Sequence, residues 1–170
     1  MLASEKLVDA FNTQIGNEFG AANQYIAIAS YFANENLDAL SQFFFRQAAE
    51  EREHGMKFVK FILDVGGQVA IPQIAEPRKD FSSAADAVQA ALNWEQEVTQ
   101  QIYGLVELSQ AERNHIANRF LDWFVNEQLE EVSLMDALLG VVQRAGENNL
   151  LYVEDYLTRH GVEGAETVAD

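Results

Sequence analysis

The sequence predicts an all-α fold: a four-helix bundle with one long crossover connection and a short fifth helix. Three features of the 170-residue chain point to it. Apolar residues recur every three or four positions through four long segments, which is the period of a helix with one buried face. Both prolines, Pro72 and Pro77, fall in one short stretch, so the chain on either side is free to be helical. The connection that contains them is far longer than the other connections.

The first two helices are predicted over Ser4–Asn34 and Leu37–Val65, and the short connection between them makes an antiparallel hairpin. Gly66-Gly67 ends the second helix, because glycine readily adopts the left-handed backbone that often follows a helix. The third helix is expected over Ser83–Gln110, where Ser82-Ser83 supplies a hydroxyl for the N-terminal cap.

The fourth helix is predicted over Asn114–Ala145, antiparallel to the third, with Gly146 as its stop. A short fifth helix is expected over Asn148–His160, capped by its first residue. The chain should therefore form one domain over residues 1–160, followed by a flexible tail over residues 161–170.

The connection between the second and third helices, residues 66–81, determines the topology of the bundle. At about 3.3 Å per residue it can span roughly 50 Å. A helix of about 28 residues is only about 42 Å long. The connection can therefore run the full length of the bundle, which leaves the second and third helices parallel.

Composition limits the classes of function. A formal net charge of −16 argues against nucleic acid and anionic membrane surfaces as partners, and it favours cations. The chain has no cysteine, so disulfides and thiolate metal sites are excluded, and a metal site must use carboxylates, imidazoles, amides and water. We see no signal peptide and no apolar run of about 20 residues, so we expect a cytoplasmic protein without a membrane span.

Each predicted bundle helix carries an apolar stripe that is interrupted by a carboxylate. The stripes, in chain order, are Phe11, Ile15, Glu18, Ala22, Tyr25, Ala29 and Phe32; Leu37, Leu40, Phe44, Gln47, Glu51, His54, Phe58, Phe61 and Val65; Val88, Ala91, Glu95, Val98, Ile102, Leu105 and Ser109; and Ala117, Leu121, Phe124, Gln128, Glu131, Met135, Leu138 and Val142. The carboxylates lie near the midpoints of their helices. Midpoints of helices of similar length meet at one level, so four carboxylates and one imidazole should converge in the middle of the bundle.

Such a cluster is costly without a cation. Carboxylates in a low-dielectric core repel one another, and none of the 11 Lys and Arg residues lies on a stripe to pair with them. Oxygen ligands with one imidazole suit iron, manganese or zinc, and the number of ligands fits two metal ions better than one. One polar residue on a stripe is often an ordinary residue at the edge of the core, as we expect for Gln47. Carboxylates that interrupt four stripes at the same depth are not explained in this way.

The motifs resemble those of the non-haem bacterial ferritins. Glu51-Arg52-Glu53-His54 is a Glu-x-x-His motif, which places both ligands on one helical face. Other similar strings are Asn17-Glu18-Phe19, Ala49-Glu50-Glu51-Arg52-Glu53-His54 and Trp123-Phe124-Val125-Asn126-Glu127-Gln128. A lone Glu-x-x-His is a weak signal. The full set, with the crossover and the short fifth helix, covers the chain from about Leu7 to His160 and is specific.

The resemblance implies a di-iron centre. A first iron would be held by Glu18, Glu51 and His54. A second iron would be held by Glu95 and Glu131, with Glu51 as a bridge between the two ions.

The resemblance also implies roles for residues around this centre. Gln128 would lie close to the second iron, and Tyr25 matches the tyrosine beside the di-iron centre, although it also fits a core aromatic with a satisfied hydroxyl. Glu50, Glu127 and Glu130 match a third iron site that shares one ligand with the second. A run of glutamates is also typical of a solvated helix face.

Departures from related families narrow the resemblance. Bacterioferritins and di-iron oxygenases typically repeat Glu-x-x-His on the last bundle helix, whereas this chain has Gln128 and Glu131 there, so one histidine ligand is missing. Bacterioferritins bind haem through a methionine directly after the Glu of the first motif, and Arg52 occupies that position here, so no haem is expected. Rubrerythrins need cysteines, which the chain lacks.

The function that the resemblance implies is iron storage and detoxification by a hollow 24-subunit homo-oligomer. Fe(II) would be oxidised to Fe(III) with O₂ or H₂O₂, which is ferroxidase activity, and ferric mineral would be deposited inside the shell. Two other hypotheses stay open. One is a di-iron or di-manganese oxidoreductase with an organic substrate, which would need a pocket beside the metals. The other is a structural bundle with protonated or hydrated carboxylates.

Overall fold

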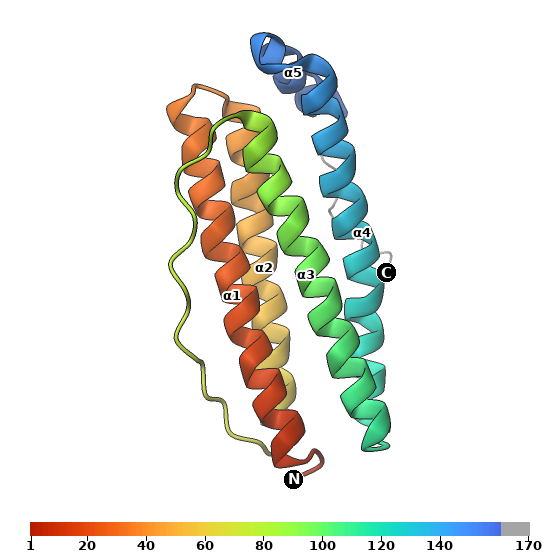
Figure 1. Ribbon diagram of the computed structural model, residues 1–170. Helices are drawn as coiled ribbons and strands as arrows, with labels where there is room; N and C mark the ends of the chain where they lie inside the picture. The colour runs from red at the N-terminus through yellow and green to blue at the C-terminus, as the bar shows by residue number, and fades with distance from the viewer. Residues whose placement is uncertain (161–170) are drawn as a thin grey trace.

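The computed structural model describes residues 1–160 as four long helices packed side by side, with a short helix across one end (Figure 1). The helices are α1 (Glu5–Asn34), α2 (Asp38–Asp64), α3 (Ala84–Ala111), α4 (His115–Ala145) and α5 (Leu150–His160), with a 3-10 turn η1 (Glu147–Asn149) before α5. The predicted all-α bundle with a short fifth helix is confirmed. The predicted tail, residues 161–170, lies outside the described residues.

The topology is set by the long connection between α2 and α3. It runs along the outside of α1 from one end of the bundle to the other, so α2 and α3 point in the same direction (Figure 1). α1 packs mainly on α2, and α3 packs mainly on α4, as antiparallel pairs. The predicted crossover is therefore confirmed.

The helix ends follow local chemistry. The hydroxyls of Ser4 and Ser83 accept hydrogen bonds from backbone N–H groups three residues later and cap α1 and α3. Gly66 and Gly146 follow α2 and α4 with positive φ angles of 77° and 71°. Asn148, the predicted cap of the fifth helix, lies inside η1 instead, because α5 begins only at Leu150.

The core consists of two apolar clusters with a polar layer between them. Every residue of the four predicted stripes is buried. One cluster surrounds Phe32 and Phe44 at the end where α5 packs, and the other surrounds Phe11 and Phe58 at the end that carries the N-terminus. The stripe carboxylates belong to neither cluster, so the fold places them at one level halfway along the bundle.

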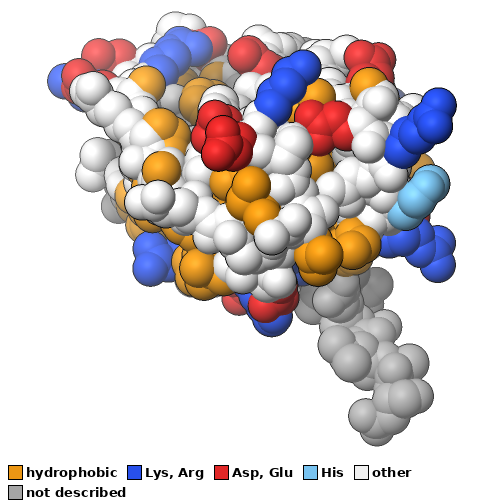
Figure 2. Space-filling model, turned by 90° about the horizontal axis from the view of Figure 1, so that it is seen from below, with side chains coloured by type: hydrophobic (Ala, Val, Ile, Leu, Met, Phe, Trp, Pro, Cys, Tyr) orange, Lys and Arg blue, Asp and Glu red, His pale blue; other side chains and the backbone are white. Residues whose placement is uncertain are grey.

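The surface at the end of the bundle that carries the N-terminus is mixed in character. Figure 2 shows the end of the bundle that carries the N-terminus, where hydrophobic side chains share the surface with acidic and basic ones. Over residues 1–160, no helix combines the length and the sustained hydropathy that crossing a bilayer requires.

Candidate metal centre

Four helices each contribute side chains to the polar layer. α1 supplies Glu18, α2 supplies Glu51 and His54, α3 supplies Glu95, and α4 supplies Gln128 and Glu131. All six are between 0% and 4% exposed. The structure thus brings the sequence-predicted ligands to one depth inside the bundle.

The first group of potential ligands consists of Glu18, Glu51 and His54. Each offers one ligand atom, and these atoms all lie within 4.8 Å of one another. His54 Nδ1 lies 3.5 Å from Glu51 Oε2, because the i,i+3 spacing places both side chains on one face of α2. Glu18 Oε2 and Glu51 Oε1 are buried without a hydrogen-bond partner.

A second group shares the same imidazole. It consists of His54, Glu127 and Glu131, whose ligand atoms also lie within 4.8 Å of one another. His54 Nε2 lies 3.6 Å from Glu127 Oε1. Glu127 is partly exposed, whereas Glu131 is buried and its Oε2 has no hydrogen-bond partner. One histidine therefore lies between two carboxylate groups.

Glu95 stands apart, because hydrogen bonds occupy both of its oxygens. The Tyr25 hydroxyl donates to Oε1, and Gln128 Nε2 donates to Oε2 at 3.2 Å. Gln128 Nε2 is also 3.2 Å from Thr99 Oγ1. Within residues 1–160, neither three-residue ligand group includes Glu95. The hydroxyl of Tyr25 is satisfied, as a core aromatic residue requires.

The residues predicted for a third iron site are only partly assembled. Glu50 is half-buried and accepts a hydrogen bond from Gln47 Nε2 at 2.9 Å. Glu130 is exposed on α4. In the described part of the chain, Glu127 joins a ligand group but Glu50 and Glu130 do not.

Burial makes these carboxyl groups weak acids. Burial raises the pKa of Glu95 from its ordinary value of 4.5 to about 7. Burial and the neighbouring charge of Glu95 raise the pKa of Glu131 to about 9. Burial also raises the pKa of Glu18 and, together with the charge of Glu95, that of Glu51. The metal-free cluster therefore retains protons at neutral pH.

His54 shifts in the same direction for a different reason. Burial alone would lower its pKa, but contacts with Glu127 and Glu51 outweigh burial and raise the pKa of the imidazole to about 11. The metal-free site thus holds a protonated imidazole beside carboxyl groups whose pKa values are also raised.

The donor set fits a divalent cation. Three of the buried carboxylates, Glu18, Glu51 and Glu131, each keep one oxygen without a partner, and such atoms are costly to bury. A divalent ion would satisfy these oxygens and would replace the protons, and carboxylates with one imidazole suit iron, manganese or zinc.

Comparison with known proteins identifies the family. A model of the ferritin-like domain family matches residues 8–145, which is most of the chain. The chain belongs to the ferritin family. It is 40% identical to ferritin BfrB of Mycolicibacterium smegmatis over 157 residues, covering 92% of this chain and 86% of that protein. It is 35% identical to the bacterial non-heme ferritin of Staphylococcus aureus over 153 residues, covering 89% and 92%.

A solved ferritin structure agrees. The open pore ferritin from the hyperthermophilic archaeon Archaeoglobus fulgidus superposes with a TM-score of 0.89 at 33% identity, covering 92% of this chain and 97% of that one. The predicted ferritin-like fold and the resemblance to non-haem bacterial ferritins are therefore confirmed.

Sequence reasoning does not identify three neighbours of the site in this ferritin. Gln14 Nε2 donates to Glu18 Oε1 at 2.8 Å, Thr99 contacts Gln128, and the Trp123 ring lies edge-on to the His54 ring with 5.3 Å between centroids. Gln14 lies four residues before Glu18, so the helical spacing could have indicated it. Nothing in the local sequence indicates the other two contacts, which join different helices.

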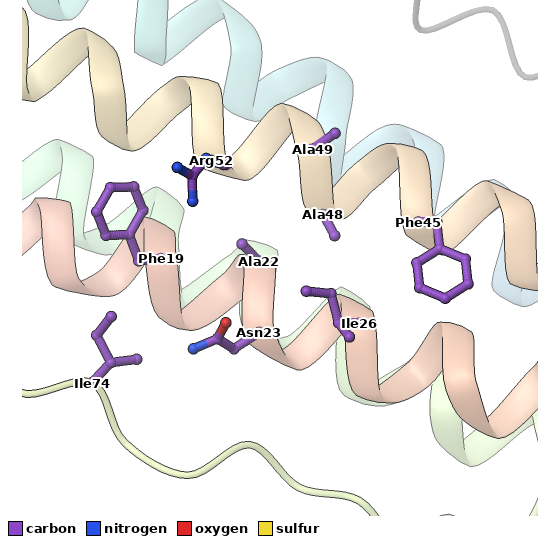
Figure 3. Close-up of a pocket in the computed structure, with 9 residues that line it drawn as sticks. All are labelled: Phe19, Ala22, Asn23, Ile26, Phe45, Ala48, Ala49, Arg52 and Ile74. Atoms are coloured by element: carbon purple, nitrogen blue, oxygen red, sulfur yellow. The ribbon is translucent and has the colours of Figure 1, made fainter.

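A pocket of about 430 Å³ lies on the outer face of α1 and α2 (Figure 3). Its walls are largely apolar, with Phe19 and Ile26 from α1, Phe45 from α2 and Ile74 from the crossover. Arg52 is its charged residue. None of the candidate ligands lines it, so this pocket does not give a substrate access to the carboxylate cluster.

Proposed function

We propose that this ferritin-family chain stores and detoxifies iron by oxidising Fe(II) to Fe(III) with O₂ or H₂O₂ and depositing ferric mineral in a hollow 24-subunit shell. One observation carries the proposal: buried carboxylate oxygens from three helices lack partners beside an imidazole. The similarity to ferritins of two bacteria supports the same conclusion. A cytoplasmic location stays a prediction.

In this proposal the first Fe(II) binds to Glu18, Glu51 and His54. These residues already form a compact group, with two partner-free oxygens. Binding requires a neutral imidazole and ionised carboxylates, so the incoming ion displaces the protons that burial retains. Proton release into solvent should therefore accompany iron binding.

The second Fe(II) binds to Glu95 and Glu131, with Glu51 shared between both ions. Glu131 offers its partner-free Oε2. Each oxygen of Glu95 already accepts one hydrogen bond, from Tyr25 or from Gln128, so the ion competes with these two donors for the carboxylate. We therefore expect Tyr25 and Gln128 to hold this carboxylate in place until the second ion arrives.

The redox step needs both ions. Each Fe(II) loses one electron, and O₂ takes up two electrons and two protons to give H₂O₂. Alternatively, H₂O₂ takes up two electrons and two protons to give two molecules of water. The carboxylate ligands favour the product, because hard oxygen donors stabilise Fe(III) more than Fe(II).

A third iron position on the α2 and α4 faces would use Glu50, Glu127 and Glu130, sharing Glu131 with the second. Glu127 and Glu50 are partly exposed and Glu130 is exposed, so this position would lie between the buried pair and solvent. It provides a place for Fe(III) that leaves the pair.

The alternative of an oxidoreductase with an organic substrate has less support. It needs a pocket beside the metals, and the pocket on the outer face of α1 and α2 contains none of the candidate ligands. Bulky side chains, including Phe44, Phe58 and Phe124, fill the core above and below the carboxylates.

The experiment that tests the proposal is aerobic addition of Fe²⁺ to metal-free protein, followed by size separation and iron counting. The same run includes Glu51→Ala and His54→Ala. Storage requires rapid oxidation, far more than three iron ions per chain in a large particle, and much slower oxidation in both variants.

Other outcomes are equally clear. Saturation at about two ions per chain in a small oligomer would contradict storage and favour the oxidoreductase. No iron binding would leave only a structural bundle.

A further inference from the structure

The side chain of Gln14 has an unusual position for a core amide. It lies on α1 one turn before Glu18 and is only 2% exposed. Its Nε2 donates to Glu18 Oε1 at 2.8 Å and to Gln101 Oε1 at 3.2 Å, while its Oε1 accepts from Asn17 Nδ2 at 3.2 Å. Both ends of the amide are therefore engaged, and α3 contributes one of the three contacts.

These contacts fix which end of the amide faces the ligand. Rotating the amide by 180° would place its oxygen against an oxygen of Glu18, and an ionised carboxylate has no proton to donate, so this hydrogen bond would be lost. The amides of Gln101 and Asn17 complete the contacts of Gln14 in its present orientation. The N–H group thus faces the carboxylate, and the surrounding contacts hold it there.

The consequence is that the two oxygens of Glu18 differ. Oε1 is occupied by the amide N–H, whereas Oε2 is buried and has no hydrogen-bond partner. An amide N–H bonded to one oxygen restrains the rotation of the carboxylate about its terminal torsion, which is otherwise broad. Oε2 is therefore the oxygen available to join Glu51 and His54.

Gln24 shows what a purely structural amide does on the same helix. It is buried to a similar extent, 3% exposed, but it exchanges two hydrogen bonds with the backbone of Arg78 in the crossover. Gln24 therefore fixes a connection, whereas Gln14 contacts a candidate ligand.

We infer that Gln14 is a positioning residue for the first iron ion: it occupies Glu18 Oε1 and reserves Oε2 as the single ligating oxygen. Gln101 supports it by holding the amide from α3. This inference rests on the proposed function, because the ion is the Fe(II) that the centre oxidises. Hydrogen-bonded neighbours of metal ligands commonly contribute 10- to 100-fold to metal affinity.

The test uses the assembled metal-free protein and Co²⁺ under anaerobic conditions, so that binding is measured without oxidation. Gln14→Met preserves the length and burial of the side chain but removes the amide, and Gln24→Met is the matched control on α1. We expect Gln14→Met to weaken binding of the first Co²⁺ by about 10- to 100-fold. The visible spectrum of the bound Co²⁺ should also change in this variant, because Glu18 is then free to bind the ion through both oxygens.

A second variant guards against misfolding. Gln14→Asn keeps the amide, but its side chain is one methylene too short to reach Glu18. It should weaken binding of the first Co²⁺ in the same way. Gln24→Met should lower thermal stability and leave Co²⁺ affinity and spectrum unchanged. Particle mass and helicity are measured for every variant.

The outcomes separate this inference from the proposed function. Normal Co²⁺ binding by Gln14→Met or Gln14→Asn, with an unchanged spectrum, would overturn the role of Gln14 alone. An equal loss in Gln24→Met would show a general effect of core amides and would also overturn it. If the unaltered protein binds no Co²⁺, the proposed metal centre itself fails.

Discussion

At the scale of single residues, the metal-free centre is a set of buried acids that keep their protons. The pKa values of Glu95 and Glu131, about 7 and about 9, lie well above the ordinary 4.5. Ionising these groups inside the core costs free energy unless a cation is present. Protons and metal ions therefore compete for the same oxygens, which makes both stability and iron binding depend on pH.

We predict that the metal-free protein becomes less stable as pH rises from about 5 to about 9. The folded state binds more protons than the unfolded state over this range, because its carboxyl pKa values are raised. The stabilisation is complete below pH 4.5 and is lost as pH rises through about 7 for Glu95 and about 9 for Glu131. His54, with a pKa raised to about 11, acts in the same direction above pH 6.5. Thermal unfolding with a chelator, across this pH series, measures the effect.

Glu131→Gln is the control for this prediction. An amide does not titrate, so the free energy of unfolding of this variant should fall less between pH 7 and 9 than that of the unaltered protein. The two slopes of unfolding free energy against pH should differ by up to about 1.4 kcal/mol per pH unit, because the variant lacks the one proton that Glu131 binds. Saturating Zn²⁺ should remove most of the decline in the unaltered protein. A stability that rises with pH over this range would contradict the raised pKa values of the buried carboxyl groups.

At the scale of elements, α1 organises the crossover as well as the metal centre. Asn12 Nδ2 donates to the Gln68 carbonyl at 2.9 Å, and its Oδ1 accepts from the Ala70 N–H at 2.8 Å. Gln24 makes the same pair of bonds with Arg78 further along the helix. A connection without helix or strand thus has part of its backbone hydrogen bonding supplied by side chains of α1.

We predict that Gly16→Ala destabilises the protein by about 1–3 kcal/mol. A Cβ atom at Gly16 would overlap Pro72 Cγ, so the crossover would have to move away from α1. Gly104→Ala in α3 is the matched control, since a Cβ atom there meets nothing within 4 Å. It should stabilise the helix by about 0.5–1 kcal/mol. Denaturant unfolding of both variants measures these changes. Equal effects of the two substitutions would contradict the close packing of Pro72 on Gly16.

A second element-scale prediction concerns the attachment of α5 to the bundle. Leu37 cannot cap α2 with its side chain, and Glu154 of α5 instead accepts hydrogen bonds from the N–H groups of Ala39 and Leu40 at 2.8 and 2.9 Å. Glu154→Ala should cost about 1 kcal/mol and expose α5 to proteases. Asp155→Ala, which loses only an exposed pair with Arg159, should change stability little. Equal stability and equal protease resistance of the two variants would contradict the role of Glu154 as the N-terminal cap of α2.

At the scale of the whole molecule, the chain exposes apolar side chains that a single copy leaves in water. Ile26, Phe45 and Met56 on α1 and α2 are 46–47% exposed, and Leu151 and Tyr152 on α5 are 77% and 66% exposed. Ile26 and Phe45 line one largely apolar pocket, and exposed apolar surface that gathers in this way is typical of subunit contacts. It supports the proposed homo-oligomer.

We predict a native mass of about 24 times the 19.0 kDa chain. Phe45→Asp should shift the protein to smaller species, because it places a charge in an apolar contact, while the far-ultraviolet signal of the helices is retained. Native mass spectrometry checks both expectations. A monomeric or dimeric unaltered protein would contradict the shell.

The sequence predicts most of this architecture because its signals are local. Helical periodicity identifies every residue of the four buried stripes, and the clustered prolines and glycines locate the crossover. The helix ends lie within two residues of the predicted ones, and at Asn148 an additional 3-10 turn replaces the expected cap. α5 packs on α2 and α4, and these long-range contacts are not part of the local sequence signal.

The sequence by itself determined the depth and the chemical type of the buried ligands, since both follow from position along a helix of known rise. Only the tertiary structure decided which oxygens are free. Glu95 has both oxygens occupied by partners on α1 and α4, whereas Glu18 has one occupied by Gln14 and one left for a cation. The bond from Gln14 to Glu18 lies within α1, but the contacts of Glu95 and the contact of Gln14 with Gln101 join helices that are far apart in the chain. The distances between these helices are set by packing rather than by sequence periodicity.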